Sequence, residues 1–130
     1  VMAAPMIPGL NDHELSAILS AARRRGARFA GYVPLRLPHG VGELFAAWLD
    51  EHYPHRKEKV LNRVRSMRGG QLNDPNFGTR FRGEGPFAEQ MLRLFEIAEK
   101  RNDFESAREL STAAFRNPQI ERQPQQLELF

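Results

Sequence analysis

The spacing of apolar residues predicts a strand, a helix and a second strand in the first third of the chain. Residues 1–7 form an almost continuous apolar run, which is typical of a strand covered on both faces. Residues at helical spacing then define one apolar face, made of Leu15, Ile18, Leu19 and Ala22. Either Asn11 or Asp12 is suited to cap this helix. Residues 27–37 indicate a second buried strand, so we predict a βαβ unit with parallel strands and a right-handed crossover.

Helical spacing continues through the second half of the chain. Three apolar faces predict three helices, and they consist of Val41, Leu44, Phe45, Trp48 and Leu49, then Val60, Leu61, Val64 and Met67, then Phe87, Met91, Leu94, Phe95 and Ala98. Pro86 suits the first turn of the last helix. Before it, residues 68–85 form a loop rich in Gly, Asn and Arg. Residues 117–130 contain many Pro and Gln residues and are expected to be a flexible tail.

This pattern predicts an α/β protein that forms part of a larger sheet. Two parallel strands do not make a stable sheet alone, because their outer edges and faces need cover. We therefore expect the N-terminal part of a larger α/β sheet or barrel to precede residue 1. The chain then divides into the strand–helix units of residues 1–37, a helical extension over residues 38–116, and the tail.

The composition narrows the possible chemistry. The chain has 130 residues, of which 41% are hydrophobic and 27% charged, an ordinary globular mixture. It contains no cysteine, which excludes disulfides, thiolate metal sites and a cysteine nucleophile within these residues. No apolar run is long enough to span a bilayer, and no secretory signal pattern opens the chain. We expect a cytoplasmic protein without membrane contact.

Positive charge is concentrated in the middle of the chain. Residues 55–82 carry eight basic and two acidic groups, a net charge of +6, whereas the whole chain has a net charge of only +3. Such a stretch could hold a polyanion and release its counterions. A solvated helix face would have the same composition, so the sequence leaves both interpretations open.

Two candidate ligand contacts follow the predicted strands. In parallel α/β folds ligands bind at the carboxyl ends of strands, where Gly9 allows close backbone approach and Asn11 can donate and accept hydrogen bonds. The alternative for Asn11 is a plain helix cap. Arg36 ends the second strand and would be costly to bury unpaired, so it should meet a carboxylate or a phosphate. A structural salt bridge to a helix satisfies the same requirement.

The loop of residues 68–85 alternates arginines with aromatic residues. Arg68, Arg80 and Arg82 could hold phosphates while Phe77 and Phe81 stack on bases. In the alternative interpretation, the two phenylalanines only pin a long loop to the body of the protein.

The chain ends in a short apolar peptide with a recognisable spacing. Its residues Gln126, Leu127, Glu128, Leu129 and Phe130 resemble the peptide motif that binds bacterial sliding clamps. Such peptides insert apolar anchors into a preformed groove. The alternative is that Leu127, Leu129 and Phe130 fold back onto the protein's own core, and short motifs of this kind also recur by chance.

Several separated motifs, in order, resemble one protein family. They are residues 4–14 (APMIPGLNDHE), 30–38 (AGYVPLRLP), 67–70 (MRGG) and 82–89 (RGEGPFAE). Together they look like the C-terminal portion of bacterial radical S-adenosylmethionine proteins described as DNA repair photolyase-like, which are related to spore photoproduct lyase. The resemblance covers the chain from Val1 to about Arg116, and the ending of the tail is also similar.

The resemblance implies the last two strand–helix units of a partial (β/α)6 barrel, followed by a family-specific helical extension. Such barrels hold a [4Fe–4S] cluster and S-adenosylmethionine at their open mouth. A Cys-x3-Cys-x2-Cys motif holds the cluster, and it would have to precede residue 1, so this chain alone should be inactive. By position, the cofactor contacts implied by the resemblance are Ile7, Gly9, Asn11, Leu35 and Arg36.

Two functions from different classes are therefore expected. The first is a part of an iron–sulfur enzyme that cleaves S-adenosylmethionine reductively to start radical chemistry, with damaged DNA as the substrate that the resemblance suggests. The second is a non-enzymatic module that binds nucleic acid or a sliding clamp. A third possibility is that residues 38–116 serve only as a helical cover for the open side of the barrel.

Overall fold

The computed structural model describes residues 1–106 and 111–117. In these residues two strands and four α-helices follow one another as β1 (Met2–Met6), α1 (Leu15–Arg24), β2 (Gly31–Pro34), α2 (Val41–His52), α3 (Lys57–Ser66) and α4 (Pro86–Arg101). Short 3-10 turns precede α1 (η1, Asp12–Glu14) and α3 (η2, Pro54–Arg56). The predicted α/β class is confirmed, while the larger barrel around it stays a prediction.

The two strands pair in parallel and are joined through α1, which confirms the predicted βαβ unit. Met2 lies opposite Gly31 and Met6 opposite Pro34, with an irregularity in the pairing between Ala3 and Met6. β2 is shorter than the strand predicted over residues 27–37. One reason is that Pro34 has no amide hydrogen to donate. At its other end, the Gly31 amide donates to the Val1 carbonyl at 2.9 Å and the Val1 amino group donates to the Phe29 carbonyl at 2.7 Å, so pairing reaches Phe29 although the regular strand begins at Gly31.

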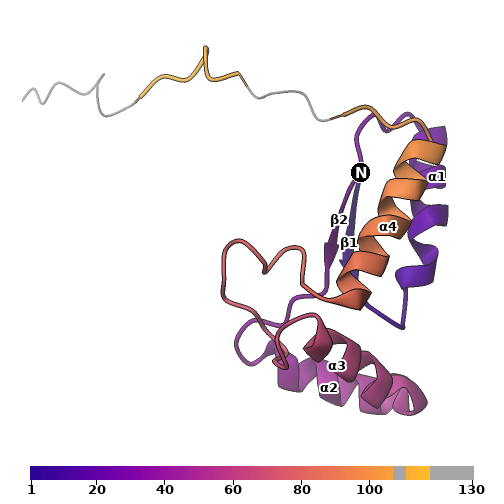
Figure 1. Ribbon diagram of the computed structural model, residues 1–130, viewed down its shortest axis with the longest axis vertical. Helices are drawn as coiled ribbons and strands as arrows, with labels where there is room; N and C mark the ends of the chain where they lie inside the picture. Colours follow the sequence, from indigo (N-terminus) through magenta and orange to yellow (C-terminus); the bar gives the residue numbers. More distant parts are fainter. Residues whose placement is uncertain (107–110, 118–130) are drawn as a thin grey trace, which may run out of the picture.

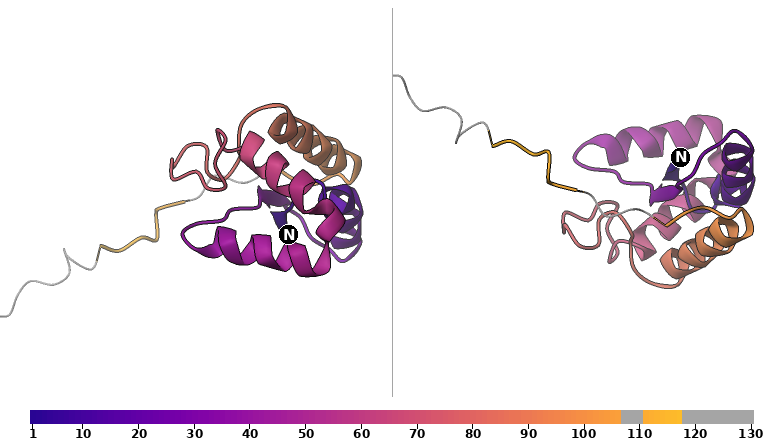
Figure 2. Two further views of the ribbon diagram at one scale, coloured as in Figure 1. Left: turned by 90° about the horizontal axis from the view of Figure 1, so that it is seen from below. Right: turned by 90° about the horizontal axis from the view of Figure 1, so that it is seen from above.

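The helices lie in two groups around the strands (Figure 1). Helices α1 and α4 run side by side along the strands, and both further views place them at the same end of the molecule (Figure 2). Helices α2 and α3 contact each other and lie beyond the carboxyl ends of β1 and β2. The loop of residues 68–85 connects α3 to α4 beside those carboxyl ends. The part of the chain expected to carry ligand contacts is therefore surrounded by later elements.

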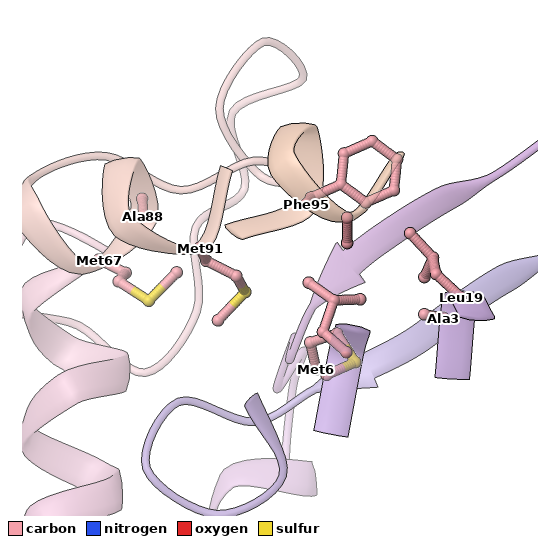
Figure 3. Packing of buried hydrophobic residues seen from close by; sticks show 9 residues of the cluster. Ala3, Met6, Leu19, Met67, Ala88, Met91 and Phe95 are labelled. Carbon is pink, nitrogen blue, oxygen red and sulfur yellow. The ribbon is translucent and has the colours of Figure 1, made fainter. Parts of the chain in front are cut away.

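The main apolar core joins elements from both halves of the chain (Figure 3). Its buried members are Ala3, Met6, Leu15, Leu19, Met67, Ala88, Met91, Phe95 and Ala98. They come from β1, α1, the end of α3 and α4, so this core crosses residue 37, where the sequence suggested a boundary between segments. Two smaller clusters, centred on Val64 and on Val60, share the partly buried side chains of Ile7, Phe45 and Leu72.

The structure buries residues on the predicted side of each helix, but fewer of the predicted core residues are buried than expected. On α2 only Leu49 of the five predicted core residues is fully buried, and Leu44 is 72% exposed. On α4 Leu94 is 43% exposed, whereas Ala88 takes a core position that the pattern did not assign. Both differences arise because each helix buries one side only: α2 packs mainly on α3, and α4 packs on α1 and on the core residues of β1. No helix in the described residues is long and apolar enough to cross a membrane.

Candidate functional site

Asn11 organises the loop that follows β1. Its Oδ1 accepts a hydrogen bond from the Ile7 amide at 2.6 Å, and its Nδ2 donates to the Pro5 carbonyl at 3.2 Å. The predicted side-chain cap of the following helix is not formed, because the amide reaches back to β1 instead. The functional group of Asn11 is thus engaged within its own loop, and its fixed geometry defines the path of residues 7–11.

Gly9 is closely approached, but by the protein itself. The residue has a φ of +86°, and a Cβ added there would lie 3.0 Å from Nη1 of Arg63 on α3. The Arg63 guanidinium also lies 4.9 Å above the Phe87 ring and 3.7 Å from an oxygen of Asp12. Arg63 was not among the site residues predicted from the sequence. In the sequence it appears only as one basic residue beside the apolar face of a predicted helix.

The remaining two residues of the cofactor prediction differ strongly from each other. Leu35 is 8% exposed, its amide donates to the Met6 carbonyl at 2.8 Å and its carbonyl accepts from Arg68 Nη2 at 3.0 Å. Arg36, the next residue, forms no ion pair with a carboxylate in the described part of the chain. The salt bridge considered from sequence is therefore not formed there, and the guanidinium lies instead on an aromatic ring.

Arg36 is one end of a stack of alternating cationic and aromatic side chains, which we call the Arg–Phe stack. It consists of Arg36, Phe81, Arg80 and Phe77. The Arg36 Cζ lies 4.5 Å from the Phe81 ring centroid. The Arg80 Cζ lies 4.9 Å from the same ring and 4.6 Å from the Phe77 ring. These are cation–π distances, and they bring one residue from the end of β2 against three from the loop.

Arg68 holds this loop in place from inside. It is only 5% exposed, and Nη1 donates to the carbonyls of Thr79 at 3.3 Å and Arg80 at 2.8 Å, while Nη2 bonds to Leu35. Burial lowers the pKa of its guanidinium, and the nearby charge of Arg36 acts in the same direction. The structure therefore gives Arg68 an internal role instead of the phosphate contact predicted from sequence. The planar guanidinium has five N–H donors, so one buried arginine can donate hydrogen bonds to carbonyl groups of two chain segments.

Asp74 closes the other side of the loop. Its Oδ1 accepts the Asn76 amide at 2.8 Å, and its Oδ2 accepts the Thr79 hydroxyl. These hydrogen bonds, with that of Thr79 the largest cause, hold the pKa of the carboxyl below its ordinary value. Beside it lies a polar hollow of about 240 Å³ lined by Arg68, Asp74, Thr79 and Glu84 among others. Asp74 was not predicted, although an Asp two residues before an Asn in a loop is a common turn signal.

Arg82 and Phe81 border a larger groove between β2 and α4. Its volume is about 730 Å³, and its walls include Tyr32, Phe81, Arg82, Ala88, Leu92 and Phe95. The Tyr32 ring packs against Phe95 with centroids 4.9 Å apart. Burial raises the pKa of the Tyr32 hydroxyl, with a further contribution from Glu96 on α4. Arg82 is exposed at the rim of this groove, as expected for a residue that could contact an anion.

The prediction of a clamp-binding peptide falls on a part of the chain that the structure does not describe. Its residues Gln126, Leu127, Leu129 and Phe130 lie outside the described residues. Among the residues that the structure does describe, no three His, Asp or Glu side chains are grouped so that they could hold a metal ion.

Comparison of the chain with protein-family models, with curated proteins and with solved structures finds no match.

Proposed function

We propose that this chain is the C-terminal part of a radical S-adenosylmethionine protein of the DNA repair photolyase-like group. The observation that carries the proposal is the parallel β1–α1–β2 unit, whose strands pair only with each other in the described residues. Parallel strands belong to sheets with more members, and their ligands bind at the carboxyl ends. The four sequence motifs resemble this family, and backbone or side-chain hydrogen bonds join them in succession: Leu35 to Met6, Arg68 to Leu35, and Glu84 to Met67.

The chain does not contain a complete cofactor site. It has no cysteine to ligate an iron–sulfur cluster. Of the residues considered for S-adenosylmethionine, Asn11 and Leu35 have their polar groups bonded within the chain and Gly9 is covered by Arg63. The residues present do not fit the cofactor by themselves, so we derive no catalytic step through it. What they do is fix the two loops that would form part of the rim of the barrel.

The test is to extend the coding sequence upstream of Val1 and purify the parent protein without oxygen. We expect three cysteines in a Cys-x3-Cys-x2-Cys motif, iron and sulfide bound to the purified protein, and release of methionine and 5′-deoxyadenosine from S-adenosylmethionine on reduction. Replacing the three cysteines with alanine should abolish the cluster and the cleavage. A parent without such a motif, or one that binds no iron, would overturn the proposal.

A second candidate function is favoured by the Arg–Phe stack. In that reading the chain is a non-enzymatic module that binds nucleic acid and contacts a sliding clamp through its last residues. The clamp contact is tested with a peptide of residues 121–130 and purified bacterial clamp. Binding that is lost when Leu129 and Phe130 are replaced with alanine would support it, and absence of binding would exclude it.

A further inference from the structure

We propose that the Arg–Phe stack binds single-stranded nucleic acid, with a base on the open face of Phe77 and phosphates at Arg36, Arg80 and Arg82. The inference rests on the second candidate function and names the kind of nucleic acid and the contacts, and it is separate from radical chemistry because it concerns a surface that this chain presents without any cofactor. It also changes the contact set expected from sequence, because Arg68 leaves it and Arg36 enters.

Phe77 is the first argument. This side chain is 80% exposed, the highest value among the exposed large hydrophobic side chains of the described residues. Its ring is held from one side by the Arg80 guanidinium at 4.6 Å, so it does not pin the loop to the body. An exposed ring with a cation behind it is a platform on which another flat group can stack.

The unsatisfied donors are the second argument. The Nε atoms of Arg36 and Arg80 are both buried and have no hydrogen-bond partner. Leaving such a donor unpaired is unfavourable, and buried polar groups are paired in the great majority of cases. Both donors belong to the same stack, in which Arg36 and Arg80 lie against the Phe81 ring, so contacts with aromatic rings and not hydrogen bonds at Nε hold the two guanidinium groups.

The local charge is the third argument. Arg36, Arg80 and Arg82 form no ion pair with a carboxylate among the described residues. The nearest buried carboxylate, Asp74, is engaged with Thr79 and Asn76. The positive charges of these arginines therefore have no carboxylate partner within the described residues, and a bound anion would reduce the repulsion between them.

A single strand fits this surface better than a duplex or a simple anion. Arginines alone would accept any polyanion, but Phe77 adds a stacking face that phosphate cannot use. Base faces are accessible only where bases are unstacked, which occurs in single strands. The loop is fixed by Arg68 and Asp74 before any ligand arrives, so binding requires little ordering of the surface.

The experiment measures the binding of the 130-residue chain to a fluorescein-labelled oligothymidylate of about ten nucleotides by fluorescence anisotropy, with circular dichroism to verify folding. Phe77→Ala should weaken binding by roughly fivefold to a hundredfold, the range for loss of one stacked base. Arg80→Ala should weaken binding and reduce the salt dependence by about one phosphate contact. Phe115→Ala and Arg93→Ala are the matched controls, since Phe115 is 73% exposed and the Arg93 side chain 76% exposed away from the stack.

Four further probes separate the alternatives. An abasic oligonucleotide of equal length should bind at least fivefold more weakly than oligothymidylate, and a duplex should bind more weakly than a single strand. Oligouridylate that binds as well as oligothymidylate would extend the site to RNA, whereas weaker binding would restrict it to DNA. Heparin that binds as tightly as oligothymidylate, equal affinity for the abasic strand, or an unchanged affinity in Phe77→Ala would overturn the proposal. These results are independent of whether the parent protein holds a cluster.

Discussion

The body formed by β1, α1 and α4 and the loop of residues 68–85 are held by different forces. In the body, Met6, Leu15 and Leu19 are at most 1% exposed and pack against α4. In the loop, the contacts are hydrogen bonds from Arg68 and to Asp74, together with the Arg–Phe stack. Burial of apolar surface stabilises the body without regard to direction, whereas the loop depends on a few directional contacts.

This difference separates stability from recognition. The apolar body tolerates changes that keep its volume. The loop and the end of β2 each contribute one buried donor without a partner, and the loop exposes Phe77, which costs stability but leaves a surface of defined shape. Substitutions in the body should therefore change stability most, and substitutions at the tip of the loop should change it least.

The largest effect on stability is expected from Leu19→Ala on α1. Leu19 is fully buried between the strands and α4, so its loss removes apolar contacts and leaves a cavity. We expect a loss of about 3 kcal/mol in the free energy of unfolding, measured by urea denaturation. Leu44→Ala is the matched control, because Leu44 is 72% exposed and should change stability by less than about 0.5 kcal/mol. Equal losses in both variants would contradict the description of the core.

Arg68→Ala should have the next largest effect. It removes three hydrogen bonds and leaves the carbonyls of Leu35, Thr79 and Arg80 without this donor. We expect a loss of about 2 kcal/mol and faster proteolysis within residues 68–85. Arg68→Lys should not restore the loop, because one ammonium cannot reproduce the planar fork. Arg56→Ala, at an exposed arginine, is the control. Unchanged proteolysis of the loop in Arg68→Ala would contradict its internal role.

The strands and helices were predictable from sequence because their apolar residues obey a period. The parallel unit, the three later helices and Pro86 at the start of α4 all follow from spacing and turn chemistry. The roles of the loop residues were not predictable in this way. Arg68 and Arg80 look alike in sequence, and only the fold shows that one is buried among carbonyls while the other lies between two rings. For Asn11 the sequence left a helix cap and a ligand contact open, and the fold forms neither side-chain cap nor free amide, since its partners are decided by the path of β1.

A smaller effect is expected from protonation of Asp74. Because its hydrogen bonds lower its pKa in the folded state, the carboxylate contributes stability above the ordinary carboxyl pKa of about 4. That contribution is lost as the pH falls through the lowered pKa. We expect the Asn76 amide resonance, followed by NMR, to shift in acid with a midpoint below the ordinary pKa of an Asp carboxyl. In Asp74→Asn this transition should disappear. A midpoint above that ordinary value in the wild-type chain would contradict the arrangement.

The smallest effect on stability is expected from Phe77→Ala, which should change the free energy of unfolding by less than about 0.5 kcal/mol because the ring is 80% exposed. The same variant should lose much of the binding to single strands, so it separates the two properties most sharply. A double variant with Arg68→Ala tests how they are connected. If Arg68 acts on binding only by fixing the loop, each substitution alone should weaken binding, and the double variant should be no weaker than the weaker of the two. Additive losses of binding free energy would mean that Arg68 and Phe77 contact the nucleic-acid strand independently. That result would contradict the assignment of Arg68 to positioning the loop and of Phe77 to contacting the ligand.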